Sequence, residues 1–396
     1  MKAVKSKVVF LIEKVKCTGC MACVQSCPRS CIRIEKDQLG NLYPAILEMS
    51  CIQCGKCDLV CPEHYPVPKR VPQHAWAAWS LDADTRSKAA SGGAASEFYR
   101  QALQDGWWIC GTAWQADFKA VHELSKDFGT IERFQNSKYV FSDCSDAYSK
   151  IAELLKSGER VLFISLPCKV AGLLKFLGGS HKNLLTVDIV CHGTPSHQML
   201  KEHIAAVDPY HEATALSFRI DNTFAFHLKN GTRTVYRKVG RMDLYLASFL
   251  EGLSYRPSCY RCSYADNGRV SDLTICDFWG LGKEIPFDHP YIGAVSAVLV
   301  NTPAGESFWN RCKQAFFFEE RPVREAIAGN AQLNFPTPIH PRQAIFESLY
   351  KNCGFEKAVS KILKREIVTE QIKIVRISIR RKLRYVAGIL IKRYRG

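Results

Sequence analysis

The amino-acid sequence predicts a mixed α/β protein, of the α/β (α+β) class, in which a small cysteine-rich domain precedes a larger α/β domain. Three observations predict it: a repeated cysteine motif near the N-terminus, a proline-rich connector behind it, and alternating strand and helix patterns from about residue 91. The chain has 396 residues, of which 47% are hydrophobic and 23% are charged. This globular composition excludes a disordered, collagenous or coiled-coil chain.

The N-terminal domain is defined by its cysteines. Nine of the 18 cysteines lie between Cys17 and Cys61, and residues 17–28 and 51–62 repeat the pattern C-x2-C-x2-C-x3-C-P with a period of 34 residues. Two-cluster bacterial ferredoxins have this spacing, and the fourth cysteine of each of their repeats binds the other cluster. We therefore expect two 4Fe–4S clusters in residues 1–70, with the ligand sets Cys17, Cys20, Cys23 and Cys61, and Cys51, Cys54, Cys57 and Cys27.

Zinc is the alternative for these cysteines, but zinc favours two separated C-x2-C pairs over two four-cysteine repeats. Cys31 falls outside both repeats, and we expect it to be a small buried residue of a hairpin within residues 31–46. Four prolines between residues 62 and 72 indicate an extended connector and a domain boundary. We therefore assign residues 71–90 to a linker.

The larger domain begins near residue 91, where strand and helix patterns alternate. Apolar runs predict strands, and apolar residues at helical spacing predict helices. The expected strands are 107–114, 160–166, 184–190 and 292–300, and the expected helices are 96–103, 148–156 and 170–177. This alternation predicts a mostly parallel sheet covered on both faces, whereas residues 214–240 alternate as antiparallel strands do. The predicted divisions are 91–165, 166–345 and a basic amphipathic tail, 346–396.

Four further cysteines stand in distinctive contexts. Cys168 and Cys191 each follow a predicted strand, and Cys259 and Cys262 form a C-x2-C pair. Open α/β sheets build their sites at the carboxyl ends of their strands, where these four residues could converge. The residues alone leave three interpretations open: a third cluster, a zinc site, or two core cysteines with an unrelated C-x2-C pair.

Six segments of the larger domain, in this order, resemble the beta-subunit family of coenzyme F-420 hydrogenase/dehydrogenase. The segments are Ser91–Gly93, Ser137–Ser142, Leu166–Leu173, Val187–Ser196, Arg256–Cys262 and Arg269–Gly280. The resemblance covers about half of the chain, and a ferredoxin domain is commonly fused in front of such proteins. It implies an iron–sulfur flavoprotein that binds FAD and passes electrons between the flavin and the ferredoxin clusters. It also implies a third 4Fe–4S cluster, on Cys168, Cys191, Cys259 and Cys262.

The same segments supply candidate flavin contacts. Ser91, Gly92 and Gly93 precede a predicted helix, whose N-terminal amides suit a phosphate, although a plain loop is the alternative. Lys138 and Tyr139 are candidates as a cation and a stacking ring. His192 is a candidate catalytic group near the flavin, with a structural role as its alternative.

The expected function is that of an iron–sulfur flavoprotein oxidoreductase. A flavin exchanges two electrons with a hydride carrier and single electrons with clusters. Its hydride partner would be a deazaflavin, coenzyme F-420, or an organic substrate. A polysaccharide-pathway substrate is one option, because members of the family occur among genes for surface polysaccharides. The alternative is a non-enzymatic electron-transfer subunit that serves a separate catalytic partner.

The net charge of +16 is concentrated at the C-terminus, where residues 361–396 hold twelve lysines and arginines against two glutamates. Because the body is nearly balanced and carries no nucleic-acid-binding motif, we expect no nucleic-acid partner. The chain has neither an apolar run of about 20 residues nor a signal-peptide core, which predicts a cytoplasmic protein with reduced thiols.

An apolar stripe in the tail predicts an amphipathic helix, and it consists of Ile379, Leu383, Val386 and Leu390. Three environments suit such a helix: the protein's own surface, the inner face of an anionic membrane as a peripheral contact, or an acidic protein partner.

Overall fold

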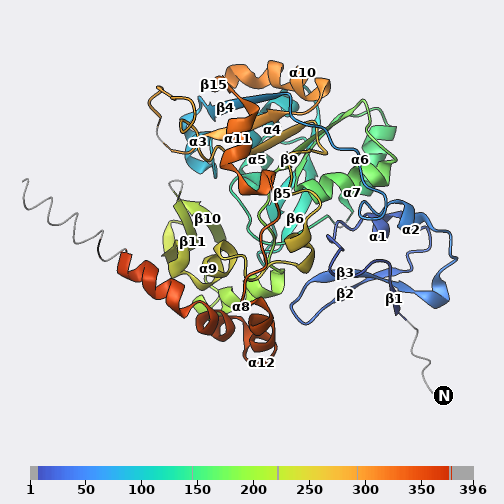
Figure 1. Cartoon of the computed structure of the whole chain (residues 1–396). Helices are drawn as coiled ribbons and strands as arrows, with labels where there is room; N and C mark the ends of the chain where they lie inside the picture. Colours follow the sequence, from blue (N-terminus) through green and yellow to red (C-terminus); the bar gives the residue numbers. More distant parts are fainter. Residues whose placement is uncertain (1–7, 145, 221–222, 292, 374–375, 377–396) are drawn as a thin grey trace, which may run out of the picture.

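The computed structural model describes residues 8–144, 146–220, 223–291, 293–373 and 376. It contains a nine-stranded sheet with helices on both faces, a separate three-stranded sheet beside a group of helices, and a small N-terminal module with its own three-stranded sheet (Figure 1). The predicted mixed α/β class is confirmed. The predicted tail stripe, residues 379–390, lies outside the described residues. Within them, no helix combines the length and the apolar character needed to cross a membrane.

The strands are β1 (Val8–Phe10), β2 (Ile32–Lys36), β3 (Leu42–Leu47), β4 (His74–Ser80), β5 (Trp108–Trp114), β6 (Ala120–Ser125), β7 (Ser142–Asp143), β8 (Val161–Ser165), β9 (Leu184–Ile189), β10 (Ala215–Ile220), β11 (Thr223–Asn230), β12 (Arg233–Val239), β13 (Leu273–Asp277), β14 (Ser296–Val300) and β15 (Phe316–Arg321). The α-helices are α1 (Ala22–Ser26), α2 (Lys56–Leu59), α3 (Ala83–Lys88), α4 (Ala94–Gln104), α5 (Thr130–Phe134), α6 (Ala147–Lys156), α7 (Pro167–Leu177), α8 (His197–Val207), α9 (Leu244–Leu250), α10 (Pro303–Cys312), α11 (Val323–Gly329) and α12 (Gln343–Ile362).

The large sheet is mixed, with four parallel strands in its centre and one more parallel pair, β6 and β7, at one edge. Its order is β15-β4-β14-β13-β9-β8-β5-β6-β7, and β13, β9, β8 and β5 are mutually parallel. Strands β15, β4 and β14 pair antiparallel, and so do β5 and β6. The expectation of a mostly parallel sheet is therefore corrected. The loop between Trp114 and Ala120 is too short for the crossover that a parallel neighbour requires.

Both faces of the central strands are buried, because successive residues of β8 face opposite sides. Leu162 and Ile164 belong to the core cluster that includes side chains of α4 and α10. Val161 and Phe163 belong to the cluster that includes side chains of α6 and α7. This two-sided burial explains why the strand is a continuous apolar run rather than an alternating one.

Residues 71–90 are not a linker. Residues 74–80 form β4, which pairs with both β14 and β15 inside the large sheet, and residues 83–88 form α3. Ala75, Ala77 and Ala78 of β4 are fully buried. The apolar run of alanines and tryptophans suits a strand that has a neighbour on each side. The last proline of the connector, Pro72, lies just before this strand. The structure has no domain boundary at residue 166. Strand β8 and helix α7 follow each other directly there, and their side chains belong to one core cluster.

The predicted tail begins too early. Residues 343–362 form α12, which is kinked at Gly354 and packs with α8, α9 and the sheet β10-β11-β12 in a second core. Phe346, Phe355 and Val359 of this helix are almost fully buried. Any separate tail therefore starts after Leu363, which is itself buried.

The N-terminal module sits against the larger domain beside α6 and α7 (Figure 1). The side-chain oxygen of Gln25 accepts a hydrogen bond of 3.1 Å from the backbone N–H of Ser149. Gly172 of α7 lies so close to Cys20 that a Cβ there would stand 2.8 Å from the Cys20 Cβ. The module is thus packed into the core that α7 covers, which includes Cys20 and Ala22.

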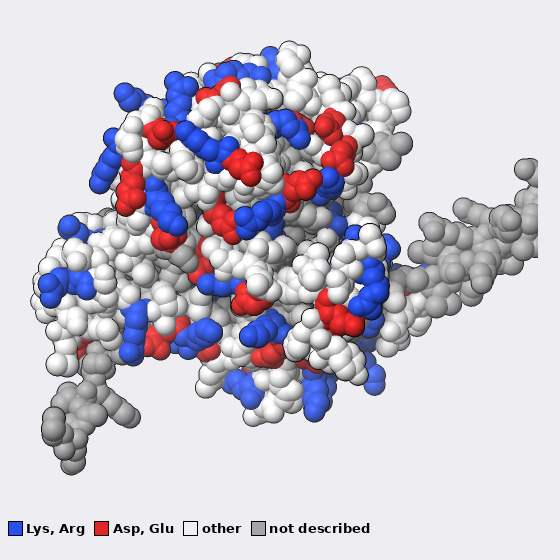
Figure 2. All heavy atoms as spheres, turned by 180° about the vertical axis from the view of Figure 1, so that it is seen from behind, with Lys and Arg blue, Asp and Glu red and all other residues white. Residues whose placement is uncertain are grey.

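Basic and acidic side chains are interspersed over the face of the molecule seen in Figure 2. On that face the described lysines and arginines form no continuous basic surface.

Candidate functional site

The first cysteine set predicted from the repeats lies around one small cavity. Its lining includes Cys17, Cys20, Cys23 and Cys61, the crossed set, and not Cys27 of the same repeat. All four side chains are buried, with exposed fractions of 7 to 9%. Burial raises the pKa of the Cys20 thiol to about 12, and Cys17 and Cys61 add to the shift. We call this group the proximal set, because it is the one packed against the larger domain.

The second predicted set lines a different small cavity. That lining includes Cys27, Cys51, Cys54 and Cys57, together with Cys31. These residues are more accessible than the proximal set, and Cys54 is exposed. Cys31 is buried as expected, but its sulfur lies 3.4 Å from that of Cys27, so it belongs to the wall of this cavity. We call Cys27, Cys51, Cys54 and Cys57 the distal set.

Local backbone geometry shapes both loops. Gly19 and Met21 in the first repeat, and Gln53 and Gly55 in the second, have positive φ angles of 54° to 71°. Left-handed residues turn the chain sharply, which directs closely spaced cysteines toward one point. Cys57 also lies close enough to Cys23 to raise the pKa of its thiol, after burial and the other proximal cysteines, so the two sets are neighbours.

The structure also brings together Cys168, Cys191, Cys259 and Cys262, which we call the third set. Burial raises the pKa of the Cys168, Cys191 and Cys262 thiols, the last to about 11. Beyond burial, each of the six pairs among the four cysteines is close enough for one member to raise the pKa of the other. Cys168 lies at the N-terminus of α7, the helix against which Cys20 packs. The third set therefore neighbours the proximal set, on the side of the larger domain.

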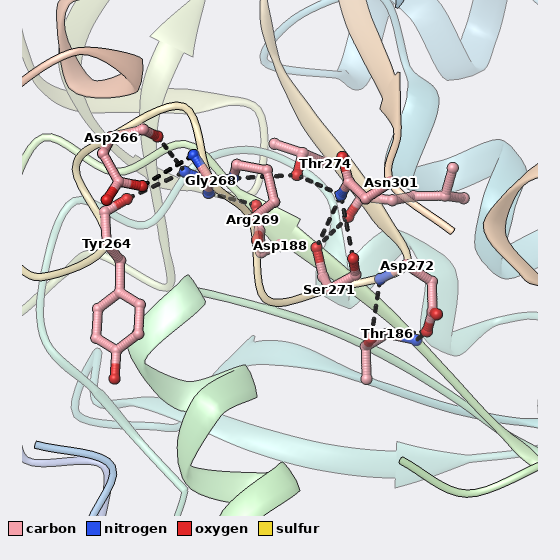
Figure 3. Close-up of polar contacts among 11 residues, drawn as sticks. Thr186, Asp188, Tyr264, Asp266, Gly268, Arg269, Ser271, Asp272, Thr274 and Asn301 are labelled. Carbon is pink, nitrogen blue, oxygen red and sulfur yellow. Dashed lines mark hydrogen bonds and ion pairs between the residues drawn. The ribbon is translucent and has the colours of Figure 1, made fainter. Parts of the chain in front are cut away.

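A buried network around Arg269 holds the loop that follows Cys262 (Figure 3). The Arg269 guanidinium is 1% exposed, and it donates to Asp188 Oδ1 at 2.5 Å, to the Tyr264 carbonyl at 3.1 Å and to the Asp266 carbonyl at 3.3 Å. Its backbone also pairs with that of Arg70. Arg269 thus ties the loop after Cys262 to strand β9 and to the connector that follows the N-terminal module.

Among the described residues, no group of three or more histidines, cysteines, aspartates or glutamates is spaced to hold a single metal ion. The ligands of a cubane bind four different irons, and they are therefore spaced more widely than ligands that share one ion. The two cysteine-lined cavities suit a four-iron cluster by their donor chemistry.

A cavity of about 470 Å³ opens beside the third set, and Cys191 lines it. This volume is within the range of cofactor sites. Its walls come from the carboxyl ends of β8, β9 and β13, from the start of α4, and from strands of the small sheet. Its position agrees with the rule that α/β sheets bind ligands at the carboxyl ends of their strands.

The predicted phosphate loop lies at this cavity. Ser91, Gly93 and Ala94 line it, and Gly93, with a φ of 93°, is the residue from which α4 begins. Gly92 lies behind this lining: a Cβ there would stand 2.4 Å from the Ala78 carbonyl oxygen. Gly92 therefore lets the loop pack on β4, and Gly93 turns the chain into the helix.

Lys138, Tyr139 and His192 also line the cavity, but each has other contacts. The Lys138 ammonium donates to the Gln135 carbonyl at 3.1 Å, and burial lowers its pKa to about 7. The Tyr139 ring is already stacked on Phe249, at 4.5 Å between centroids. His192 is exposed to solvent at the cavity. Neighbouring protein atoms still remove part of its hydration, and this desolvation lowers the pKa of its imidazole.

Sequence reasoning missed three polar residues of the cavity wall. Arg219 donates to the Tyr139 hydroxyl at 2.8 Å and to Asp277 Oδ2 at 2.6 Å. Asp277 Oδ1 and Asn136 Oδ1 are buried acceptors for which the described structure has no hydrogen-bond donor. Asp277 stands in Arg269–Gly280, one of the six segments that carry the family resemblance. Arg219 lies in an ordinary alternating strand, which offered no signal.

Two family models match separate parts of the chain. The family model for the C terminus of the coenzyme F420 hydrogenase/dehydrogenase beta subunit matches residues 158–326, and that of the 4Fe-4S dicluster domain matches residues 16–65. Among solved structures, the chain is similar to one from the xenon-derivatized F420-reducing NiFe hydrogenase complex of Methanosarcina barkeri. The identity is 16%, the match covers 76% of this chain and 93% of that chain, and the TM-score is 0.45. A search of curated proteins found no match.

Proposed function

We propose that this chain is an iron–sulfur flavoprotein oxidoreductase of the coenzyme F420 hydrogenase/dehydrogenase beta-subunit family. The match of residues 158–326 to the model for the C terminus of that subunit, and of residues 16–65 to the 4Fe-4S dicluster domain, supports this proposal. It transfers electrons between 4Fe–4S clusters and FAD. One observation carries this proposal: the distal set, the proximal set, the third set and the 470 Å³ cavity follow one another as neighbours through the molecule.

The cysteine sets fit clusters by their donors. Each predicted set offers four thiols, and thiolates are the usual ligands of 4Fe–4S clusters. The raised pKa values of buried thiols such as Cys20 and Cys168 disfavour free thiolates there. Bound iron supplies the positive charge that stabilises the thiolate form. We assign the three clusters to the proximal, distal and third sets.

The large cavity fits a dinucleotide cofactor by its polar ends. The N-terminus of α4 at Gly93 presents backbone N–H groups suited to a pyrophosphate. The oxygens of Asn136 and Asp277 that have no donor among the described residues are acceptors for N–H groups of a ligand. A bound flavin supplies the conversion between two-electron hydride chemistry and one-electron transfer.

The remaining wall residues orient the ligand and limit water. Arg219 is held between Tyr139 and Asp277, so its charge is fixed at the cavity wall. Lys138, with a pKa near 7, can hold or release a proton close to neutral pH. His192 stands at the accessible side, where a hydride partner would enter. That partner is a deazaflavin such as coenzyme F420 or an organic substrate, with a polysaccharide-pathway intermediate as one case.

The test is the iron, acid-labile sulfide and flavin content of the full chain purified without oxygen. We expect about twelve irons, from three clusters of four, and one FAD per chain. Loss of the flavin absorbance after a one-electron donor reduces the clusters would support electron exchange between the clusters and the flavin. Intact clusters without flavin would reject the flavoprotein assignment and favour the electron-transfer subunit with a separate catalytic partner.

A further inference from the structure

Two cations of the larger domain are buried against the proximal cysteine loop. The side chains of Lys169 and Arg256 are each 1% exposed. Lys169 Nζ donates to the Gly19 carbonyl at 2.5 Å, and Arg256 Nε donates to the Cys17 carbonyl at 2.7 Å. Both cations therefore bind the backbone of the short segment that joins Cys17 to Cys20.

Among the residues that the structure describes, neither cation has a carboxylate within ion-pair distance. Arg256 Nη2 donates to the Leu42 carbonyl, and Nη1 is buried with no hydrogen-bond partner in the described part of the chain. Their other close neighbours are aromatic: the Lys169 ammonium lies 4.2 Å from the Phe141 ring centroid, and the Arg256 guanidinium lies 4.2 Å from that of Tyr43. Carbonyl dipoles and ring faces ease the burial of a cation, but they do not cancel its charge.

The other buried arginines show that this is unusual within the molecule. Arg269 is paired with Asp188, Arg219 with Asp277 and Arg321 with Glu325. Removing a charge from water without an opposite charge is strongly unfavourable. Two such cations on one loop therefore point to an anion that occupies the same place in the working protein.

The loop itself indicates that anion. Lys169 directly follows Cys168 of the third set, and Arg256 lies three positions before Cys259 of that set. Arg256 also donates a hydrogen bond to the carbonyl of Cys17 in the proximal set. A 4Fe–4S cluster with four thiolates is anionic, and its reduction adds one further negative charge. Burial makes that extra charge unfavourable, whereas a fixed positive charge nearby makes it favourable.

We propose that Lys169 and Arg256 are the counter-charges of the proximal cluster, and that they raise its reduction potential so that a cluster buried in the protein still accepts an electron. This inference rests on the proposed function, because it requires a cluster on the proximal set. Neither residue is a ligand of the cluster: the hydrogen bonds to the loop carbonyls hold each charge in place, and the charge itself acts on the cluster. The distal set needs no such device: its neighbouring cations, Arg29 and Lys56, are exposed, and water and salt screen them.

The test compares reduction potentials, measured by EPR-monitored titration with dithionite as the one-electron donor, in variants of the full chain. Lys169→Met and Arg256→Met remove the charge and keep most of the volume. Each is expected to move the potential of the cluster on Cys17, Cys20, Cys23 and Cys61 to more negative values and to leave the distal cluster unchanged. Lys169→Arg and Arg256→Lys keep the charge, and the reduction potential of the proximal cluster is expected to stay close to the wild-type value in both. Lys56→Met is the exposed control, and its smaller effect should fall on the distal cluster and fade with added salt.

Iron content separates the possible failures. If Lys169→Met holds the full iron content and the proximal potential is unchanged, the inference is wrong while the proposed clusters stand. If wild-type protein binds no iron at the proximal set, the proposed function itself fails. If the neutral variants lose that iron and the charge-retaining variants hold it, the counter-charge is needed for assembly, which supports the inference. Loss in both classes overturns it, because shape rather than charge then explains the two residues.

Discussion

The two cysteine repeats have the same spacing but occupy different surroundings. The proximal set is buried beneath α7, and its loop backbone is bound by two cations of the larger domain that have no carboxylate partner among the described residues. The distal set stands at the surface with Cys54 exposed. A ligand motif therefore specifies which metal centre can form, but not its exposure or the charges around it. Those properties depend on what the rest of the chain packs against each repeat.

The largest expected difference between the repeats concerns folding. Cys20→Ser and Cys54→Ser should each remove one cluster, or about four irons, because each deletes a ligand. Only Cys20→Ser is expected also to lower the melting temperature clearly, since Cys20 belongs to the core beneath α7. Iron analysis and thermal unfolding under anaerobic conditions measure both effects. Cys353→Ser, at a cysteine outside the three sets, is the control, and equal melting temperatures for Cys20→Ser and Cys54→Ser would contradict the comparison.

A second substitution tests whether the sets are crossed. Cys27→Ser should damage the cluster of Cys51, Cys54 and Cys57 and spare that of Cys17, Cys20 and Cys23, because Cys27 lines the distal cavity. EPR spectra of the reduced variant, compared with those of Cys54→Ser and Cys17→Ser, make the distinction. A spectrum that matches Cys17→Ser would show that each repeat binds its own cluster.

A buried cation that does have carboxylate partners gives a reference for Lys169 and Arg256. Burial opposes protonation of His203, but Asp243 Oδ2 at 2.9 Å and Glu356 Oε1 at 2.6 Å outweigh it and raise its pKa to about 9. Because the folded pKa exceeds the unfolded one, near 6.5, this stabilisation is complete below pH 6.5 and is lost as the pH rises through 9.

Denaturant unfolding should therefore show the free energy of unfolding falling by about 3 kcal/mol between pH 6.5 and pH 9.5 from this group. His203→Gln should be less stable at pH 6 and should remove most of that slope. His211→Asn, at an exposed histidine, should keep the slope. An unchanged slope in His203→Gln would show that the imidazole is not charged in the folded protein.

The smallest expected effect concerns the 470 Å³ cavity, which lies next to the third set. Gly93→Ala and Gly106→Ala alter the two ends of α4, where both glycines have positive φ. Each should lower stability by about 1 kcal/mol through backbone strain. Only Gly93→Ala is expected to weaken flavin retention, measured by fluorescence of the released cofactor, because only Gly93 lines the cavity. Equal flavin retention in both variants would remove the phosphate loop from the proposed site.

The sequence determined what local patterns can specify. The strand and helix patterns between residues 96 and 190 predicted α4, β5, α6, β8, α7 and β9 to within a few residues, because both faces of the sheet are apolar and the helices are amphipathic. The spacing of the repeats also predicted the crossed grouping in which the cavities hold Cys27 and Cys61. The short spacings bring together three thiols of each repeat, and the ferredoxin pattern assigns the fourth thiol to the other repeat.

Tertiary structure alone decided the features that join distant segments. Residues 74–80 become a central strand because β14 and β15, more than 200 residues later, pair with them, and no local pattern announces that pairing. Residues 343–362 become core because α8, α9 and the small sheet cover their apolar side. Lys169 and Arg256 read as ordinary polar residues in the sequence, and only the packing of the N-terminal module removes them from water and sets them on the Cys17–Cys20 loop. Burial and electrostatics depend on neighbours in space, which sequence spacing does not encode.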